Sequence, residues 1–328
     1  MSQRPFRWGL LSTARINRAI IPPLRASARH ALVAVASRDP ARGAAYAREW
    51  EIPRVYDSYD ALLNDPEIDA IYNPLPNALH AFWTIRATRA GKHVLCEKPL
   101  ATTVEDVEAI AEAAAAAGVV VTEAFMYRHH PQTLRLQALL AEGAIGPVQL
   151  IRSAFTFMLT RTEDARWEPG MGGGSLWDVG CYPVSMSRLL AGGEPDEVFG
   201  RSRLTPGGVD DAFTGQMAFG GIVAQFDCGF RAPFRTHLEV VGTEGVITVP
   251  APFKPGPGAR LLVSRGVDTR EVTVEDQPLY IGELDDLADA AAGRTQPRVT
   301  LADSRGTVAA ILALYESSRR RVPVTLPR

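Results

Sequence analysis

Short apolar runs alternate with longer amphipathic segments over the first 124 residues of the chain. The segments between the runs have helical spacing and end near residues 26, 50, 90 and 117, and the apolar runs are FRWGLLS, ALVAVAS, DAIYNPLP, HVLCEKP and VVVTEAF. Strands that alternate with helices predict a parallel sheet covered on both faces. The runs are rich in Val, Ile and Leu without clean alternation, which is typical of strands buried on both sides.

The pattern changes after residue 124. A helix is expected over residues 132–142, and strands are expected in QLIRSAFTFML, DAFTGQMAF, IVAQFDCGF, THLEVVG and GVITV. Several of these strands alternate in polarity and are joined by Gly-rich turns, which predicts a largely antiparallel sheet with one more exposed face. Three prolines predict a surface loop over residues 251–259, and a last helix is expected over residues 301–321.

These patterns predict an α/β protein of two domains. Residues 1–124 are expected to form a doubly wound, parallel sheet with helices on both faces. Residues 125–328 are expected to form a separate α+β domain with a large, mostly antiparallel open sheet. A length of 328 residues suits one or two domains, and an apolar content of 46% can fill their cores.

Charge and cysteine content narrow the class of protein. The chain has 35 basic and 37 acidic residues and a net charge of −2, so it lacks the basic field that drives binding to nucleic acid or membranes, and neither partner is expected. Three distant cysteines suit reduced thiols. Neither these nor the six histidines have the spacing of metal ligands, so no metal is expected. No secretory or membrane-spanning pattern is present, which predicts a soluble, cytoplasmic protein.

The end of the first predicted strand carries a candidate dinucleotide turn. There a pyrophosphate would rest on backbone N–H groups at the start of a helix. Of the usual glycine pattern only Gly9 remains, because Ser12 and Thr13 occupy the tight turn, although Ala14 keeps the last position small. A single glycine between a strand and a helix is also an ordinary turn, so this motif alone leaves both interpretations open.

The end of the second predicted strand bears on the choice of cofactor. Ser37 and Arg38 stand where NAD enzymes usually place an acid, and an arginine with a hydroxyl accommodates a 2′-phosphate. Asp39 follows, but Asp39 and Pro40 also have the pattern of a helix cap, and a cap leaves Arg38 available. NADP is therefore expected in preference to NAD.

Two further segments carry candidate chemistry. Glu97, Lys98 and Pro99 end a buried strand at the carboxyl edge of the sheet, where ligands of open α/β folds bind, although a salt-bridged loop would look the same. In the second domain a GGG sequence leads into an expected helix that runs to residue 190. Asp178 and Tyr182 lie four residues apart on it and share one face. A buried tyrosine bonded to an aspartate is the alternative interpretation.

Taken together and in order, WGLLSTARI, SRDP, YNPLPNALH, EKP, EAFMYRHHP and GGGSLWDVGCYP resemble the Gfo/Idh/MocA oxidoreductases over nearly the whole chain. The set is most similar to the branch that contains glucose-fructose oxidoreductase, NADP-dependent D-xylose dehydrogenases and dimeric dihydrodiol dehydrogenase. The resemblance implies a Rossmann domain, and a C-terminal domain whose open sheet often forms the oligomer interface. It also implies hydride exchange between a nicotinamide and a sugar or related alcohol.

The resemblance also implies roles for individual residues. Lys98 would lie between the nicotinamide ribose and the substrate, followed by a cis bond to Pro99, and Tyr182 would transfer the proton. Many family members have an acid where this chain has Ser185, which argues against an inositol dehydrogenase. Cofactor contacts are implied for Gly9, Ser12, Thr13, Ala14, Arg15, Ile16, Ser37, Arg38, Leu75, Pro76, Asn77, His80, Glu97 and Lys98. Substrate contacts are expected for Arg128, Phe157, Trp167 and Asp178.

We therefore expect an NADP-dependent dehydrogenase of an unphosphorylated sugar, such as D-xylose or D-glucose at C1, or of a cyclic trans-diol. Tyr182 would be the acid/base, assisted by Lys98 and with Asp178 holding a second hydroxyl. Two alternatives stay open, namely a ketosugar reductase of deoxysugar or anhydrosugar metabolism and a non-catalytic NADP-binding regulator. The same acid/base serves both directions of reaction. A homodimer or homotetramer is expected, because an uncovered apolar sheet face is usually an interface.

Overall fold

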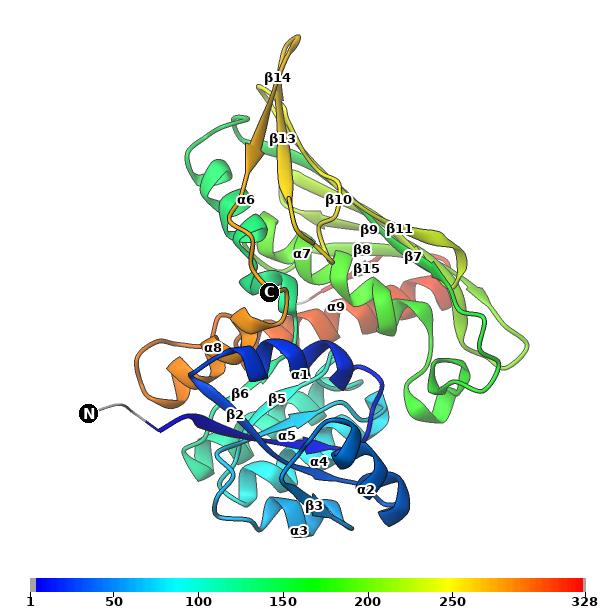
Figure 1. The fold of residues 1–328 in the computed structure, drawn as a ribbon. Coiled ribbons are helices and arrows are strands. Elements are labelled where there is room, and N and C mark those ends of the chain that lie inside the picture. The colour runs from blue at the N-terminus through cyan, green and yellow to red at the C-terminus, as the bar shows by residue number, and fades with distance from the viewer. Residues whose placement is uncertain (1–3, 327–328) are drawn as a thin grey trace. The chain divides into compact units, whose positions relative to one another are not determined.

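The computed structural model describes residues 4–326 of the chain (Figure 1). It divides into two compact units: unit 1 comprises Met1–Met126 and Tyr280–Ser304, and unit 2 comprises Tyr127–Leu279 and Arg305–Arg328. The first boundary lies close to the expected residue 124. In contrast, the segment Tyr280–Ser304 from the C-terminal half of the sequence belongs to unit 1. The first part of unit 2 is therefore inserted between the two parts of unit 1, and the chain returns to unit 2 at Arg305.

Unit 1 contains a six-stranded parallel sheet with the strand order β3-β2-β1-β4-β5-β6, which is the doubly wound Rossmann order (Figure 1). The expected fold class is thereby confirmed. Its strands are β1 (Phe6–Leu11), β2 (His30–Ala36), β3 (Arg54–Tyr56), β4 (Ala70–Asn73), β5 (His93–Cys96) and β6 (Val121–Glu123). Its helices are α1 (Asn17–Ala26), α2 (Pro40–Glu49), α3 (Tyr59–Leu63), α4 (Asn77–Arg89), α5 (Val104–Ala117) and α8 (Ile281–Ala291).

Helix α8 completes the core of unit 1 from the far end of the sequence. Its Leu284 and Leu287 are fully buried in the cluster that contains Trp8, Leu10 and Leu95 of the parallel strands. The sequence pattern did not predict α8, because four acidic residues interrupt its short apolar stripe. Burial of large apolar side chains contributes about 1.5–3 kcal/mol each, so α8 is an integral part of this core.

Local signals explain where the helices of unit 1 begin and end. Asp39 caps α2 by accepting from the backbone N–H of Arg42 at 3.1 Å, and Pro40 occupies the first helical position. Thr103 caps α5 in the same way, and Gly118 ends α5 in the left-handed conformation at φ 65°. The expected cap at Asp39 is thus confirmed.

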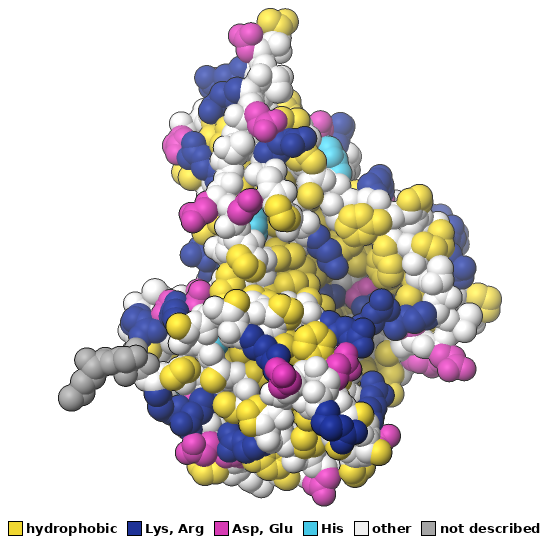
Figure 2. Space-filling view, in the orientation of Figure 1, with side chains coloured by type: hydrophobic (Ala, Val, Ile, Leu, Met, Phe, Trp, Pro, Cys, Tyr) yellow, Lys and Arg dark blue, Asp and Glu magenta, His cyan; other side chains and the backbone are white. Residues whose placement is uncertain are grey.

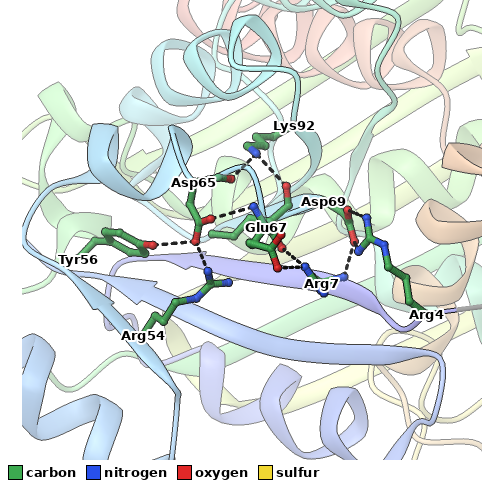
Figure 3. A network of polar contacts seen from close by, with 9 residues as sticks. Arg4, Arg7, Arg54, Tyr56, Asp65, Glu67, Asp69 and Lys92 are labelled. Carbon is green, nitrogen blue, oxygen red and sulfur yellow. Dashed lines mark hydrogen bonds and ion pairs between the residues drawn. The ribbon is translucent and has the colours of Figure 1, made fainter.

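A network of ion pairs surrounds the amino ends of the strands in unit 1 (Figure 3). Asp69 accepts from the Arg4 guanidinium at 2.7 and 2.8 Å and from the Arg7 N–H at 2.9 Å. Asp65 pairs with Arg54 at 2.7 Å and accepts from the Tyr56 hydroxyl at 2.7 Å. Burial raises the pKa of Asp65, but these partners outweigh it and hold the pKa below its ordinary value. Ligands of such folds bind at the opposite edge, so the network serves stability.

Unit 2 is built on a nine-stranded sheet with the order β14-β13-β12-β11-β7-β10-β9-β8-β15. All neighbours are antiparallel except β7 and β10, which confirms the mostly antiparallel sheet. The strands are β7 (Val148–Met158), β8 (Glu197–Leu204), β9 (Asp210–Phe219), β10 (Ile222–Gly229), β11 (Arg231–Gly242), β12 (Val246–Val249), β13 (Arg260–Arg265), β14 (Asp268–Thr273) and β15 (Val324–Thr325). The longer helices are α6 (Pro131–Ala141), α7 (Cys181–Ala191) and α9 (Leu301–Arg320).

The surface charges, the cysteines, and the absence of membrane-spanning helices and metal clusters are three features of the described residues. Positive and negative side chains are interspersed on the face of each unit that Figure 2 shows, without a field of one sign. Cys96, Cys181 and Cys228 are buried free thiols. No helix between residues 4 and 326 combines the length and apolar character needed to cross a membrane. Within the same residues, no three His, Cys, Asp or Glu side chains gather as a metal site requires.

Candidate active site

The turn between β1 and α1 is shaped to hold an anion. Gly9 lies in β1, and Ser12 adopts a φ of 87°, a left-handed conformation that is uncommon for residues other than glycine. The Asn17 side-chain amide donates to the Ser12 carbonyl at 2.9 Å and stabilises the turn. No side chain caps α1, and the backbone N–H groups of residues 13–15 have no partner among the described residues. These free donors at a helix start fit a pyrophosphate.

The residues after β2 form a cationic pocket beside this turn. Ser37 is buried and accepts from the Asp39 N–H at 3.2 Å. Burial raises the pKa of Tyr59, and the positive charge of Arg38 partly offsets this effect. Arg42 donates to the Thr13 carbonyl at 3.4 Å and so joins α2 to the anion-binding turn. A cavity of about 380 Å³ is lined by Thr13, Ala14, Arg15, Arg18, Arg42, Ala45, Tyr46 and Glu49. With Asp39 engaged as a helix cap, the charged groups suit a phosphate rather than a free ribose hydroxyl.

The loops after β4 and β5 meet at the carboxyl edge of the same sheet. Leu75 and Pro76 precede α4, which begins at Asn77. His80 is only 1% exposed, and its ring lies 2.6 Å from the Leu75 carbonyl and 2.7 Å from the Pro99 carbonyl. Burial lowers the pKa of His80 to about 4, although both carbonyls favour the protonated ring. His80 therefore connects the two loops from inside and positions them.

Glu97 and Lys98 occupy that edge as expected. The Glu97 N–H donates to the Asn73 carbonyl at 2.9 Å, and its carboxylate accepts from the Tyr72 hydroxyl at 2.5 Å. The Lys98–Pro99 peptide bond is cis, as the family resemblance implied. The residues of unit 1 with implied cofactor contacts thus lie at the carboxyl ends of β1, β2, β4 and β5, in the turns and loops that follow them, or in the first turn of α4.

In unit 2 Tyr182 lies in an aromatic cluster at the start of α7. It is 5% exposed, and its ring lies 5.7 Å from Tyr127, 5.1 Å from Phe155 and 5.6 Å from Phe253. Phe253 comes from the proline-rich loop at residues 251–259, which is irregular as predicted. The prediction that the whole loop lies at the surface was wrong, because Phe253 is fully buried by its ring contacts. These contacts hold the tyrosine ring in one orientation.

The segment before Tyr182 differs from the single helix that was expected. Leu176–Gly180 forms a turn of π-helix, and α7 begins only at Cys181. Such turns often occur at functional sites. Asp210 holds the start of the turn, since one carboxylate oxygen accepts from the Ser175 hydroxyl at 2.6 Å and from the Leu176 N–H at 2.8 Å. The wider turn changes the spacing between Asp178 and Tyr182 from that of one regular α-helix face.

Asp178 lies in this π-helical turn and is paired with an arginine. The Arg166 Nε donates to Asp178 at 2.6 Å, and the same guanidinium contacts Asp164 at 3.2 Å. The charge of Asp178 raises the pKa of Arg166, so the guanidinium remains ionised. A carboxylate paired in this way is a positioned hydrogen-bond acceptor rather than a general base.

The three weaker substrate candidates fall into two groups within unit 2. The buried Arg128 donates to the Ser185 hydroxyl at 3.1 Å, at the position where many family members have an acid. Phe157 and Trp167 are both half-buried, and each ring lies 5.3 Å from Phe230. Phe157 and Trp167 therefore belong to one aromatic cluster, and Arg128 lies against Ser185 in α7.

Four residues that shape these sites were not found from the sequence: Arg42, Arg166, Asp210 and Phe253. Arg42 had a usable signal, because it follows Arg38 by one helical turn. The other three act on residues distant in sequence, and no local pattern marks such pairings.

Comparisons with known proteins identify the family of both units. Residues 6–125 match the description "Oxidoreductase family, NAD-binding Rossmann fold", and residues 133–248 match "GFO/IDH/MocA C-terminal domain". The chain belongs to the Gfo/Idh/MocA oxidoreductase family. The expected recognition is therefore confirmed.

Three members of the Gfo/Idh/MocA family show what this chain is similar to. An NADP(+)-dependent D-xylose 1-dehydrogenase from Haloferax volcanii is 39% identical, with 97% of this chain and 99% of the relative covered. A 3-ketoreductase from Actinomadura kijaniata, solved with NADP and TDP-benzene, has a TM-score of 0.90 at 29% identity, covering 95% and 98%. An aldose-aldose oxidoreductase from Caulobacter crescentus, solved with glycerol, has a TM-score of 0.91 at 28% identity, covering 98% and 100%. The expected enzyme class, an oxidoreductase acting on hydroxyl or keto groups of such molecules, is supported at the level of the family.

Proposed function

We propose that the protein is an NADP-dependent dehydrogenase that oxidises a hydroxyl of an unphosphorylated sugar, such as C1 of D-xylose or D-glucose, or of a cyclic trans-diol. The observation that carries this proposal is the 39% identity, over nearly the full length of both chains, to an NADP(+)-dependent D-xylose 1-dehydrogenase. The motifs that imply Lys98 and Tyr182 as reacting residues are intact.

The charged groups beside the first turn support NADP as the cofactor. Arg38 and Arg42 provide two cations, Ser37 provides a hydroxyl, and the only nearby acid of this segment, Asp39, is used by α2. The implied contacts of Gly9, residues 12–16, Leu75, Pro76, Asn77 and Glu97 would hold the remainder of the dinucleotide. NADP⁺ supplies the hydride acceptor when it is bound.

The proposed acid/base is Tyr182, which takes the hydroxyl proton as the C–H bond breaks. A nearby ammonium group favours the phenolate, and this is the role proposed for Lys98. Asp178, held by Arg166, would accept a hydrogen bond from a second hydroxyl and orient the substrate. Arg128, Phe157 and Trp167 would complete the substrate contacts.

Initial rates with D-xylose, D-glucose and a trans-dihydrodiol test the proposal, with NADP⁺ and NAD⁺ compared in parallel. Tyr182→Phe is expected to lower kcat at least about 100-fold, because general acid–base catalysis contributes 10²–10⁴-fold. Its binding of NADP⁺ should stay unchanged. Tyr56→Phe is the matched control, since Tyr56 contacts Asp65 at the amino end of the sheet. Turnover of Tyr182→Phe within a factor of two of the unaltered enzyme would contradict the assignment.

A ketosugar reductase is the second candidate, because the Actinomadura kijaniata 3-ketoreductase covers nearly the same length with a TM-score of 0.90. Oxidation of NADPH with a ketosugar, in the absence of aldose oxidation, would favour this candidate. Tight NADPH binding without turnover in either direction would favour a regulator.

We also propose a cytoplasmic homodimer or homotetramer. Buried free thiols support a reducing compartment. Several large apolar side chains on the strands of the nine-stranded sheet are 38–63% exposed, namely Met158, Phe199, Leu204 and Phe234, and such surfaces commonly meet a partner. Light scattering at micromolar concentration tests the oligomer, and a monomeric mass would exclude it.

A further inference from the structure

Glu283 of α8 is a buried acid that the proposed reaction does not use. Its side chain is fully buried, and neither carboxyl oxygen has a hydrogen-bond partner among the described residues. Its neighbours along the helix, Leu284 and Leu287, lie in the apolar core. Burial of an ionised carboxylate without a partner is costly, so a group in this position holds a proton instead.

The surroundings of Glu283 contain a second carboxyl group. Helix α8 packs against β5, which ends directly before Glu97, and Glu97 acts on Glu283 electrostatically. Tyr72 and Tyr280 also act on the pair, and Lys98 adjoins it because its backbone N–H donates to Glu97 at 3.3 Å.

The three remaining acids of α8 are engaged elsewhere. Arg29 pairs with Asp285 at 2.8 Å and with Asp289. Asp286 accepts from the Arg298 N–H at 2.9 Å. Helix α1 faces α8 with apolar side chains of the same core, Ile20, Ile21 and Leu24.

Glu283 is fully buried and Glu97 is half-buried, and two interacting carboxyl groups do not ionise independently. Once Glu97 is ionised, a second negative charge is opposed by both burial and repulsion, and these effects raise the pKa of Glu283 well above its ordinary value. The Tyr72 hydroxyl donates to Glu97 at 2.5 Å, which favours Glu97 as the ionised partner. The pair therefore carries one proton and one negative charge.

We propose that Glu97 and the protonated Glu283 form an electrostatically coupled pair that makes the relative affinity for oxidised and reduced nicotinamide cofactor depend on pH. This inference rests on the proposed function, because it places the nicotinamide near Glu97. Glu283 is a positioning residue in this scheme, acting through the charge of Glu97.

The sign of the effect follows from charge. The oxidised nicotinamide ring carries one positive charge more than the reduced ring, so it favours the doubly ionised pair and promotes release of the proton held by Glu283. The neutral reduced ring leaves the proton in place. Affinity for NADP⁺ relative to NADPH therefore increases as the pH rises, by at most about tenfold per pH unit for one proton.

Binding measurements with both cofactors test this coupling without turnover. NADPH fluorescence titration and NADP⁺ competition give the ratio of the two Kd values from about pH 6 to pH 9. The unaltered protein is expected to change this ratio about fivefold or more. In Glu283→Gln, which keeps the shape but cannot ionise, the ratio should stay constant. Asp285→Asn makes the same chemical change on the same helix and should retain the full pH dependence.

A second measurement tests the proton itself. The infrared spectrum of the unaltered protein at neutral pH should contain the carbonyl band of a buried protonated carboxylic acid, and Glu283→Gln should lose it. An equal pH dependence in the unaltered protein and Glu283→Gln, or the absence of a band that depends on Glu283, would overturn the inference. If neither cofactor bound the unaltered protein, the proposed function and this inference would fail together. If both bound with a constant ratio, only the inference would fail.

Discussion

Arg42 is placed by two contacts that have separate purposes. Its backbone N–H donates to Asp39 and starts α2, and its guanidinium reaches the Thr13 carbonyl in the anion-binding turn. Arg38 of the same segment is exposed and provides a second positive charge. One short sequence therefore presents two cations while its only acid is occupied, which is how a selective site for the 2′-phosphate can arise from few residues.

Arg42→Ala is expected to weaken NADP⁺ binding about 10- to 100-fold, because a charge-assisted hydrogen bond contributes about 1.5–3 kcal/mol. Binding of NAD⁺, which lacks the 2′-phosphate, should change less than threefold, roughly 0.6 kcal/mol. Arg48→Ala on the exposed side of α2 is the control and should alter neither affinity. Isothermal titration with both cofactors measures the difference, and an equal loss for NAD⁺ would contradict the proposed contact.

Among the elements, the π-helical turn Leu176–Gly180 is the one most dependent on a distant partner. Asp210 of β9 accepts from Ser175 and Leu176 with one oxygen and from the Tyr315 hydroxyl at 2.6 Å with the other. Gly174 approaches this carboxylate closely at φ 118°, where a Cβ would lie 2.3 Å from Asp210 Oδ1. The turn that carries Asp178 is therefore held by β9 and α9.

Gly174→Ala should lower the free energy of unfolding by about 2–4 kcal/mol, since it combines a strained backbone with displacement of a buried carboxylate. Gly193→Ala is the matched control, because no atom lies within 4 Å of the added Cβ and its φ is not left-handed. Urea denaturation of both variants measures the effect. A loss below about 1 kcal/mol for Gly174→Ala would show that Asp210 can move without cost.

At the scale of the molecule, the parallel sheet and most of its helices followed from the sequence, because buried parallel strands give continuous apolar runs. Short elements such as β3 and α3 did not, and neither did α8, whose stripe includes the buried Glu283. The candidate site divides in the same way. Turn residues such as Ser37 and Arg38 follow strands and could be predicted by position, whereas the Arg166–Asp178 and Asp210–Ser175 contacts depend on tertiary structure.

The free energy of unfolding of the chain should decrease as the pH rises, because Glu283 is buried in its protonated form. A folded-state pKa raised above the unfolded value means that the native state binds more protons, so this contribution is complete below the unfolded pKa of about 4.3 and is lost as the pH rises through the folded value. The slope for one proton is at most about 1.4 kcal/mol per pH unit. The free energy of unfolding, measured with urea at several pH values, should depend less on pH in Glu283→Gln than in the unaltered protein. An equal dependence in both proteins would contradict a buried protonated acid at this position.

The division of unit 1 between two segments of the sequence has a consequence for how the protein is made. Residues 4–126 leave the ribosome first, but the side of their core formed by Trp8, Leu10 and Leu95 is closed by Leu284 and Leu287. The nascent dinucleotide-binding half therefore keeps an uncovered apolar surface until residues 127–279 have been translated. A premature stop codon anywhere before residue 280 removes α8, so a truncated product lacks both part of unit 2 and a complete cofactor-binding half.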